Sequence, residues 1–459
     1  MKYCKVLVVI SLLLLSVAGI NAQWLDTTIT VGAYPTTMCW NATNNKIYVN
    51  NYFSQYIKVV DGASNIPMAG IFIGNNPGAL SWNATSNKVY CACEGASNRY
   101  VTVINGATDT KICSIPTGAT PKYLVWNAQN NKVYCAHFNN GLMSIIDGLA
   151  NTLIKTTAIG TEVNAICLNA TNNKVYTANY YSDNVSIVNC ATDTTIATVS
   201  TPTKPMALCW NSTNNKVYVA CNYSNNVMIL DGVTNAVLAT VSLGLSAAPR
   251  ALCWNSTNNK VYCACEGTNK VAVIDGSSNA LLTTVSVWNT PRSIIWNPIN
   301  NKLYVGNMQS NSVSIINCVS NTLINTIPVG TQPNGFCHNA TNNRTYVANY
   351  ASSSLSVLRD SMGSGIAENN QISLNQFNLF FQTIQNHNLS YTLNTLLPEN
   401  LNFSLYNING GKIMSWQVSA LKGTSHYTKN LTDLTAGIYF VQIDNNKGQK
   451  FNQKLIVTR

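Results

Sequence analysis

The feature that most constrains the fold of this chain is a sequence unit that occurs eight times. Each copy has an aromatic residue or its substitute, an Asn-rich stretch, a Lys or Arg and, two residues later, a Tyr, as in WNATNNKIYV. The copies start 42 or 44 residues apart, at Trp40, Trp82, Trp126, Leu168, Trp210, Trp254, Trp296 and His338. This regularity indicates a repeat architecture in which each unit packs on its neighbours.

Within each unit the pattern predicts four short strands. In the first unit we expect them at 37–40, 46–50, 56–60 and 66–73, separated by turns rich in Asn, Gly and Ser. Alternating apolar and polar positions bounded by such turns are typical of β-hairpins. Four strands with a period in the low forties are the pattern of a propeller blade.

Strand counting predicts how the ring closes. Only seven fourth strands follow the eight repeat cores, and the segment 24–31 resembles the fourth strand at 321–329. We therefore expect 24–31 to complete the last blade by pairing with 355–358, which leaves no exposed sheet edge. The predicted fold class is all-β: an eight-bladed β-propeller, or seven-bladed if one unit is degenerate, closed by its N-terminal strand and followed by a small C-terminal β-sandwich domain.

The repeats carry a family resemblance. The motifs KVYVACNYSNNVMILDG, NNKLYVGNMQSNSVSIIN and RTYVANYASSSLSVL resemble the YVTN-type β-propeller repeat family over residues 24–360. The resemblance implies a surface or periplasmic propeller, and such a fold does not by itself fix function. The Asn-rich turn before the Lys departs from the family, which more often has Pro-Asp-Gly there, and this changes a turn rather than the blade.

The N-terminal segment 1–22 reads as a cleaved signal peptide, with Lys2 and Lys5 before an apolar run and Ile20-Asn21-Ala22 before the expected cut. No later run is apolar enough to span a membrane, so we expect no transmembrane segment after signal removal. The expected domains are the propeller at 23–360, a linker at 361–372 and a sorting domain at 373–459.

The C-terminal segment is similar to the sorting domain of the type IX secretion system. The matching positions include Leu405, Tyr406, Leu434, Ile438 and Phe440, and the expected sorting-signal residues are Gly410, Gly411, Lys412, Gly437, Tyr439 and Lys454. The resemblance implies that the type IX machinery is a partner and that the protein is secreted or lies on the outer surface of a Gram-negative bacterium. The family's Asn-Pro opening is missing, so the domain start stays open, and a sandwich that only stiffens the chain end is the alternative.

The repeated polar and aromatic residues are expected to be structural. The net charge of +11 comes from cations spread at one per repeat, so we expect no nucleic-acid partner. Hairpin counting places Lys46 opposite Asp61 and predicts a cross-strand ion pair there and in equivalent blades. The Tyr ring represented by Tyr48 is expected to pack between blades. The six Asn-x-Ser/Thr triplets that directly follow the aromatic position of a repeat or its substitute, such as that at Asn41, are interpreted as turns rather than as glycosylation sites.

The cysteines and acidic residues offer little chemistry. Fourteen cysteines remain after signal removal, and the two Cys-Ala-Cys-Glu-Gly motifs, at 91–95 and 263–267, should lie on opposite sides of an eight-bladed ring. Neither motif supplies a full ligand set for a metal. We expect buried thiols, with room for one or two disulfides, no metal and no cofactor.

No nucleophile elbow, phosphate loop or metal-binding pair is present, so we expect a non-enzymatic binding protein. Its expected ligand is a protein or a glycan, bound on the loops before each first strand and between second and third strands, where residues vary between repeats. The expected face contains Tyr52, Tyr56, Tyr100, Lys122, Phe138, Tyr180, Tyr181, Tyr223, Arg250 and Arg292. The alternatives are an ordinary wet loop face, a matrix protein, an oxidoreductase subunit, or a lyase that acts through His137 or His338.

Overall fold

The computed structural model describes residues 23–360 without 75, 96–98 and 119, and residues 372–457 without 374–376, 386–387, 396–397, 408–410, 433, 436 and 446–449. The expected signal peptide at 1–22 and all but one residue of the expected linker at 361–372 lie outside these ranges. The regular structure of the described residues consists of β-strands, and two compact units contain them. Within the described ranges, no helix has the length and apolarity that crossing a membrane requires.

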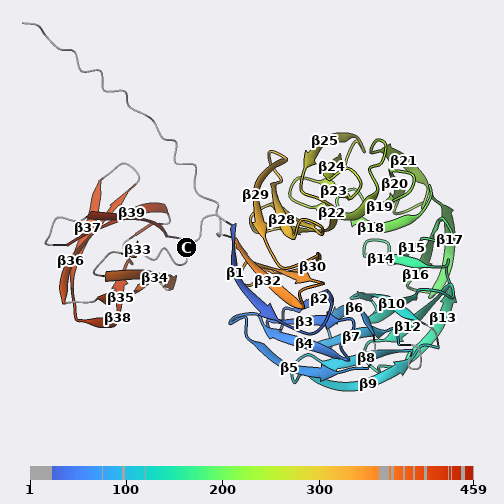
Figure 1. Cartoon of the computed structure of the whole chain (residues 1–459), viewed down its shortest axis with the longest axis horizontal. Helices are drawn as coiled ribbons and strands as arrows, with labels where there is room; N and C mark the ends of the chain where they lie inside the picture. The colour runs from blue at the N-terminus through green and yellow to red at the C-terminus, as the bar shows by residue number, and fades with distance from the viewer. Residues whose placement is uncertain are drawn as a thin grey trace, which may run out of the picture. The chain divides into compact units, whose positions relative to one another are not determined.

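The first unit, Gln23–Asp360, is a ring of eight four-stranded antiparallel sheets, and we refer to these sheets as blades 1 to 8 (Figure 1). Blades 1 to 4 contain β2 Pro35–Asn41, β3 Lys46–Asn51, β4 Tyr56–Asp61, β5 Pro67–Phe72; β6 Pro77–Asn83, β7 Lys88–Cys93, β8 Tyr100–Asn105, β9 Thr110–Pro116; β10 Pro121–Asn127, β11 Lys132–His137, β12 Leu142–Asp147, β13 Leu153–Ala158; and β14 Val163–Asn169, β15 Lys174–Asn179, β16 Asn184–Asn189, β17 Thr194–Ser200. Blades 5 to 8 contain β18 Pro205–Asn211, β19 Lys216–Cys221, β20 Asn226–Asp231, β21 Val237–Ser242; β22 Pro249–Asn255, β23 Lys260–Cys265, β24 Lys270–Asp275, β25 Leu281–Ser286; β26 Pro291–Asn297, β27 Lys302–Asn307, β28 Ser312–Asn317, β29 Thr322–Pro328; and β30 Pro333–Asn339, β31 Arg344–Asn349, β32 Ser354–Asp360, β1 Gln23–Thr30.

The N-terminal strand closes the ring, as predicted. β1 pairs with β32 in antiparallel register, so that Ile29 lies opposite Leu355 and Leu25 opposite Leu358. In Figure 1 the blue β1 lies beside the orange β32, which brings the two ends of the propeller into one blade. The eight-bladed count is therefore confirmed, and the seven-bladed alternative is wrong.

The core lies between neighbouring blades, where each blade packs its apolar face on the next. Tyr48 is fully buried and belongs to one apolar cluster with Val89 and Ile104 of blade 2. All eight repeated tyrosines are at most 1% exposed. The prediction that they pack between blades is confirmed, and it explains why the repeat requires a large side chain at this position.

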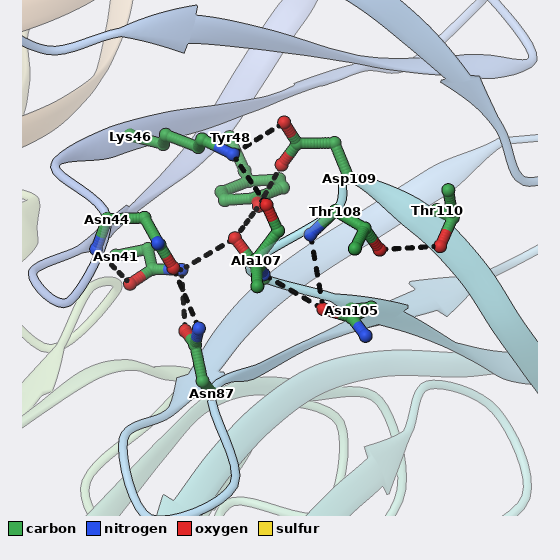
Figure 2. A network of polar contacts seen from close by, with 11 residues as sticks. Asn41, Asn44, Lys46, Tyr48, Asn87, Asn105, Ala107, Thr108, Asp109 and Thr110 are labelled. Atoms are coloured by element: carbon green, nitrogen blue, oxygen red, sulfur yellow. Dashed lines mark hydrogen bonds and ion pairs between the residues drawn. The ribbon is translucent and has the colours of Figure 1, made fainter.

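One end of the ring, which we call the Asn end, consists of the turns between first and second strands and between third and fourth strands. Here a buried Asn of each blade donates to an Asn of the next, for example Asn41 Nδ2 to Asn87 Oδ1 at 2.8 Å (Figure 2). The series runs round all eight blades and closes where Asn339 donates to Asn45 at 2.7 Å. The accepting Asn has a positive φ, 51° at Asn45, which Asn tolerates better than most residues.

This network gives the Asn-x-Ser/Thr triplets a structural role. The first Asn of each of the six triplets in the repeated turn is 0% exposed, and its side-chain oxygen also accepts hydrogen bonds from its own turn, as Asn41 does from Asn44 N at 3.2 Å. A buried amide with both ends bonded is not accessible to a modifying enzyme. The turn interpretation is therefore confirmed.

The repeated lysines bind the next blade rather than their own, which corrects the predicted ion pairs. The Lys46–Asp61 register is as expected, but Lys46 Nζ lies 2.7 Å from Asp109 Oδ2 in blade 2 (Figure 2). Tyr48 donates to the other carboxylate oxygen of Asp109 at 2.6 Å. Asp61 instead caps its own turn and accepts from Ser64 N at 2.7 Å. Lys46 and Asp61 are therefore opposite each other in the strand register but do not bond. The long Lys side chain extends between the blades and bonds to acceptors of the next blade.

The second unit contains two four-stranded sheets, β33-β34-β35-β38 and β37-β36-β39-β40. Their strands are β33 Ile372–Ser373, β34 Phe377–Gln385, β35 Asn388–Thr395, β36 Glu399–Asn407, β37 Lys412–Ala420, β38 Gly423–Asn430, β39 Gly437–Asn445 and β40 Lys450–Val457. Tyr391 of one sheet and Phe403 of the other share a buried core, with ring centroids 5.3 Å apart. The unit is the predicted β-sandwich.

Candidate functional site

The end of the ring opposite the Asn end, which we call the mouth, is where the blades differ most. Each blade contributes the second residue of its first strand (in blade 2, the residue after Pro77) and the residue that follows its second strand. The first set comprises Thr36, Gly78, Lys122, Asn164, Met206, Arg250, Arg292 and Asn334; the second comprises Tyr52, Glu94, Phe138, Tyr180, Asn222, Glu266, Met308 and Tyr350. In every blade the residue that follows the second strand donates its backbone N–H to a carbonyl oxygen of the loop that enters the first strand, as Glu94 does to Asn76 O at 2.8 Å.

A hollow of about 320 Å³ lies at the mouth over blades 8, 1, 2 and 3. Its walls come from the two variable sets, with Asn334 and Tyr350 from blade 8, Thr36 and Tyr52 from blade 1, and Gly78 and Glu94 from blade 2. Lys122 and Tyr123 complete it from blade 3. The small residues at positions 36 and 78 leave the space that Met206 and Arg250 would fill in the equivalent places of blades 5 and 6.

Glu94 is the acidic residue of the hollow. Burial raises the pKa of its carboxyl group, and the nearby Lys122 opposes this shift. No hydrogen bond or ion pair of its carboxylate is found among the residues that the structure describes. A Cβ placed on Gly78 would lie 2.9 Å from Glu94 Oε1, so the missing side chain of Gly78 gives the carboxylate its position.

Glu266 occupies the same position in blade 6, but its electrostatic environment differs from that of Glu94. Its Oε2 lies 2.9 Å from Arg292 Nε of blade 7. Lys122 is the counterpart of Arg292 beside Glu94, yet its Nζ lies 3.8 Å from the centroid of the Phe138 ring. The glutamate of the blade 6 motif, Glu266, is thus neutralised by an ion pair within the protein. The cation beside Glu94 in blade 2, Lys122, instead lies against an aromatic ring.

Aromatic rings border the hollow on blades 1 and 8. Tyr34 contacts Phe53 and Tyr350, with ring centroids 4.9 and 4.8 Å apart, and Tyr52 contacts Phe53 at 5.1 Å. Burial raises the pKa of Tyr52, and the proximity of Glu94 and Tyr350 raises it further. The four rings form a continuous cluster beside the carboxylate, and Phe53 is its most exposed member.

The expected ligand face is only partly gathered into this hollow. Tyr52 and Lys122 line it, and Phe138 contacts Lys122. Around the mouth, Lys204 Nζ lies 4.9 and 4.6 Å from the rings of Tyr180 and Tyr181, and Arg250 Nη1 contacts Met206 Sδ at 3.5 Å. Arg292 is held in its ion pair, and Tyr223 is exposed. The expected face is therefore a rim around the mouth rather than one pocket.

Two members of the expected face lie away from the hollow. Tyr56 contacts Phe72 of the fourth strand at a centroid distance of 5.4 Å, and the Tyr100 hydroxyl donates to Ile73 O at 2.8 Å. Both begin third strands, so they are directed to the outer part of their blades. The sequence predicts that both residues lie at the mouth end of the ring, but it does not predict how far each lies from the centre of the ring.

The two histidines are poorly placed for the lyase alternative. His137 is fully buried, its Nε2 lies 3.0 Å from Ser144 Oγ, and burial lowers its pKa to about 4. His338 takes the Trp position at the Asn end, beside Thr345 Oγ1 at 3.1 Å, and burial lowers its pKa to about 4 as well. His338 therefore lies away from the variable face, because the Trp position is the far end of the first strand.

The cysteines are free thiols. All fourteen in the described ranges are unpaired, and most are buried. Cys91 and Cys93 lie on one face of β7, and burial raises the pKa of Cys91 strongly. No group of three His, Cys, Asp or Glu side chains that could hold a metal occurs in the described part of the chain.

The expected sorting residues lie around the β36–β37 and β39–β40 hairpins. Lys412 begins β37, Gly437 begins β39, and Lys454 lies opposite Phe440 in β40. Gly411 N donates to Asn407 Oδ1 at 2.8 Å, Tyr439 donates to Thr435 O at 2.9 Å, and Gly410 lies outside the described residues. Their assignment as a signal stays a prediction.

Sequence reasoning missed several residues of the hollow. Gly78, Thr36 and Asn334 do not stand out in the sequence because they are small or common, and Glu94 stands out only as part of a Cys-Ala-Cys-Glu-Gly motif. The signal was present: an alignment of the eight units shows that the position after the first residue of the first strand varies in size and charge while its neighbours repeat.

Two family models match the chain. The family described as "Secretion system C-terminal sorting domain" matches residues 383–458, and the family described as "Lactonase, 7-bladed beta-propeller" matches residues 105–371, more than half of the chain. Glu94 and Tyr52 precede the second match. The matched propeller model is named for lactonases, and the YVTN name stays a prediction.

Among solved structures, Sqt1 of Saccharomyces cerevisiae is similar at 10% identity with a TM-score of 0.64, over 74% of this chain and 99% of that one. The hydrazine synthase of Kuenenia stuttgartiensis is similar at 14% identity with a TM-score of 0.52, over 73% and 97%. At such identities the likeness shows the fold alone. A search of the curated proteins found no match.

The sorting domain establishes the route of the protein, which is exported by the type IX secretion system to the cell surface or extracellular space of a Gram-negative bacterium. With the ring and its mouth described and the propeller model matched over residues 105–371, the chain belongs to the lactonase family of β-propellers, here with eight blades and a C-terminal sorting domain.

Proposed function

We propose that this protein is a non-enzymatic recognition protein of the cell surface or extracellular space, which binds a glycan at its mouth. The observation that carries the proposal is the hollow, which combines tyrosine rings with a carboxylate, an amide and a hydroxyl at positions that vary between blades. A sugar ring presents an apolar face and a rim of hydroxyl groups, and Tyr offers a matching apolar ring with a polar tip. A concave site with a few convergent polar groups suits one or two sugar residues.

The rest of the molecule supports binding rather than turnover. The invariant residues are bonded within the ring, and both propeller histidines are withdrawn from the mouth by burial or by position. Type IX export places the mouth outside the cell, where it can meet extracellular glycans. The rim of Lys204, Tyr180 and Tyr181 extends the surface beyond the hollow.

The test is a glycan array probed with the full exported chain, followed by titration calorimetry on the best hit. Replacement of both Tyr52 and Tyr350 by Ala should weaken that hit at least about tenfold, because central aromatic contacts are worth more than about 1 kcal/mol each. Tyr180→Ala with Tyr181→Ala, on blade 4, is the matched control and should change affinity less. Full affinity in the Tyr52/Tyr350 variant would refute the assignment of the hollow.

A second candidate is lactone hydrolysis, which the matched family's name suggests. The specific observation in its favour is Glu94, because a buried carboxyl with a raised pKa beside a cavity is a common form of general base. Incubation of the chain with a panel of γ- and δ-lactones tests it. Release of hydroxy acid that is lost in Glu94→Gln would favour the enzyme, and no release above the spontaneous rate would exclude it for that panel.

A further inference from the structure

We infer that the hollow over blades 8, 1, 2 and 3 selects ligands that carry a primary ammonium group, held between the Glu94 carboxylate and the rings of Tyr52 and Tyr350. The inference rests on the proposed function and names the chemistry that the site prefers. Its basis is a carboxylate without a bonded cation among the described residues, together with tyrosine rings that line the same hollow.

The missing ion pair of Glu94 is seen by comparing equivalent positions of two blades. Glu94 and Glu266 follow the second strands of blades 2 and 6, and each has a cation on the next blade. Glu266 uses its cation, Arg292, at 2.9 Å. Lys122 is placed over Phe138 instead, and Lys122 and Glu94 are the charged residues that line the hollow. A partly desolvated carboxylate without a bonded cation is stabilised by any cation that enters.

The aromatic lining favours the same kind of ligand. Tyr52 and Tyr350 both line the hollow, and Tyr34 packs on Tyr350 at 4.8 Å and restricts its ring. The face of an aromatic ring attracts cations by about 0.5–2 kcal/mol, depending on how dry the site is. A carboxylate and ring faces together discriminate an ammonium from a hydroxyl or an acetamide, whereas the rings alone would accept any sugar.

The geometry of blade 2 also keeps the carboxylate in the hollow. A side chain on residue 78 would meet Glu94 Oε1 at 2.9 Å and Lys122 O at 3.1 Å. The equivalent residue of blade 6 is Arg250, which contacts Met206. Blade 2 therefore combines the absence of a side chain at position 78 with an acid at position 94, and blade 6 does not offer a hollow of this form.

The experiment measures binding of three sugars by NMR titration of the full exported chain at pH 7: glucosamine, N-acetylglucosamine and glucose. A second arm uses Nα-acetyl-lysine amide and its Nε-acetyl form, which separates an amino sugar from a lysine side chain as the source of the ammonium. We expect glucosamine to bind at least about tenfold more tightly than both neutral sugars, a difference of about 1.4 kcal/mol.

The Glu94→Gln variant should abolish this preference while leaving weak sugar binding, since the rings remain. Glu266→Gln is the matched control, because it removes an equivalent carboxylate that is already paired, and it should keep the full preference. The preference should also weaken on acidification through the raised pKa of Glu94, because the neutral acid no longer attracts a cation. Melting temperatures of both variants check that the ring is intact.

The outcomes separate the inference from the proposed function. Equal binding of glucosamine and glucose, or a preference that survives Glu94→Gln, would overturn the ammonium inference and leave glycan recognition standing. Binding of the lysine amide with no binding of any sugar would support the ammonium site and overturn the glycan proposal. Failure of every probe to bind wild-type protein would overturn the ammonium inference, and a blank glycan array would then overturn the proposed function separately.

Discussion

The two ends of each blade have opposite sequence behaviour. At the Asn end, Asn41, Lys46 and their equivalents repeat almost without change, and each bonds to the next blade. At the mouth, equivalent positions range from Gly78 to Arg250, and Glu94 is left without a bonded partner among the described residues. Residues that hold the ring together must repeat because every interface is the same, so the variable end is where a ligand can be accommodated.

The largest loss of stability that would test this comparison is expected at Asp360, where the Asn end of the last blade completes the ring. Asp360 accepts from Lys302 Nζ and Tyr304 Oη, at 2.7 and 2.8 Å, and the Lys302 and Asp360 side chains are 3% and 1% exposed. Asp360→Ala leaves a buried ammonium without its counter-ion and should lower the free energy of unfolding by about 3–5 kcal/mol. Urea unfolding measures it.

The control is Asp61→Ala, at a carboxylate that caps only its own turn through Ser64 N. It should cost about 1 kcal/mol, as for an ordinary hydrogen bond. Equal losses in the two variants would show that the interblade contact contributes nothing beyond the local turn.

The Asn ring should show an intermediate effect. Asn211 is fully buried, donates to Asn259 Oδ1 at 2.8 Å and accepts from Thr213 N at 2.9 Å. Asn211→Ala removes the link between blades 5 and 6 and should cost about 1–3 kcal/mol, since buried polar partners are left unsatisfied. Tyr223→Ala, at an exposed mouth residue, is the control and should stay within about 0.5 kcal/mol of wild type in thermal unfolding. A more stable Asn211→Ala would contradict a structural role for the ring.

The smallest effects should have opposite signs at the two mouth glutamates. Burial raises the folded-state pKa of Glu94, so this carboxyl favours folding at low pH and that contribution is lost as pH rises through the raised pKa. Ligand-free Glu94→Gln should therefore be slightly more stable than wild type at pH 7, and the gain should vanish below the pKa of an unfolded Glu. Glu266→Gln breaks a partly exposed ion pair and should lose less than about 1 kcal/mol.

Melting curves from pH 4 to pH 8 measure both variants. A loss of stability in Glu94→Gln at pH 7 would mean that the carboxylate is stabilised within the folded protein, which would remove the contrast with Glu266.

Sequence reasoning reached the ring because its signals are local and repeated. The strand lengths, the pairing of β1 with β32 and the burial of Tyr48 follow from spacing and alternation within one unit. The partner of Lys46 did not follow, since Asp109 is 63 residues away and its distance depends on how two blades pack. The hollow depends on four blades at once, and its key residue Gly78 is notable only for the side chain it lacks.

The pairing of β1 with β32 also sets the order of events in folding. Residues 23 and 360 become partners only after the whole propeller has emerged, and joining ends that far apart in an open chain costs about 5 kcal/mol of loop entropy. Until then β1 and the edge strand β32 of blade 8 are unpaired along the edges that they later share. The ring therefore closes last. Asp360, which joins blade 8 to blade 7 through its ion pair with Lys302, lies immediately before the segment that leads to the sorting domain.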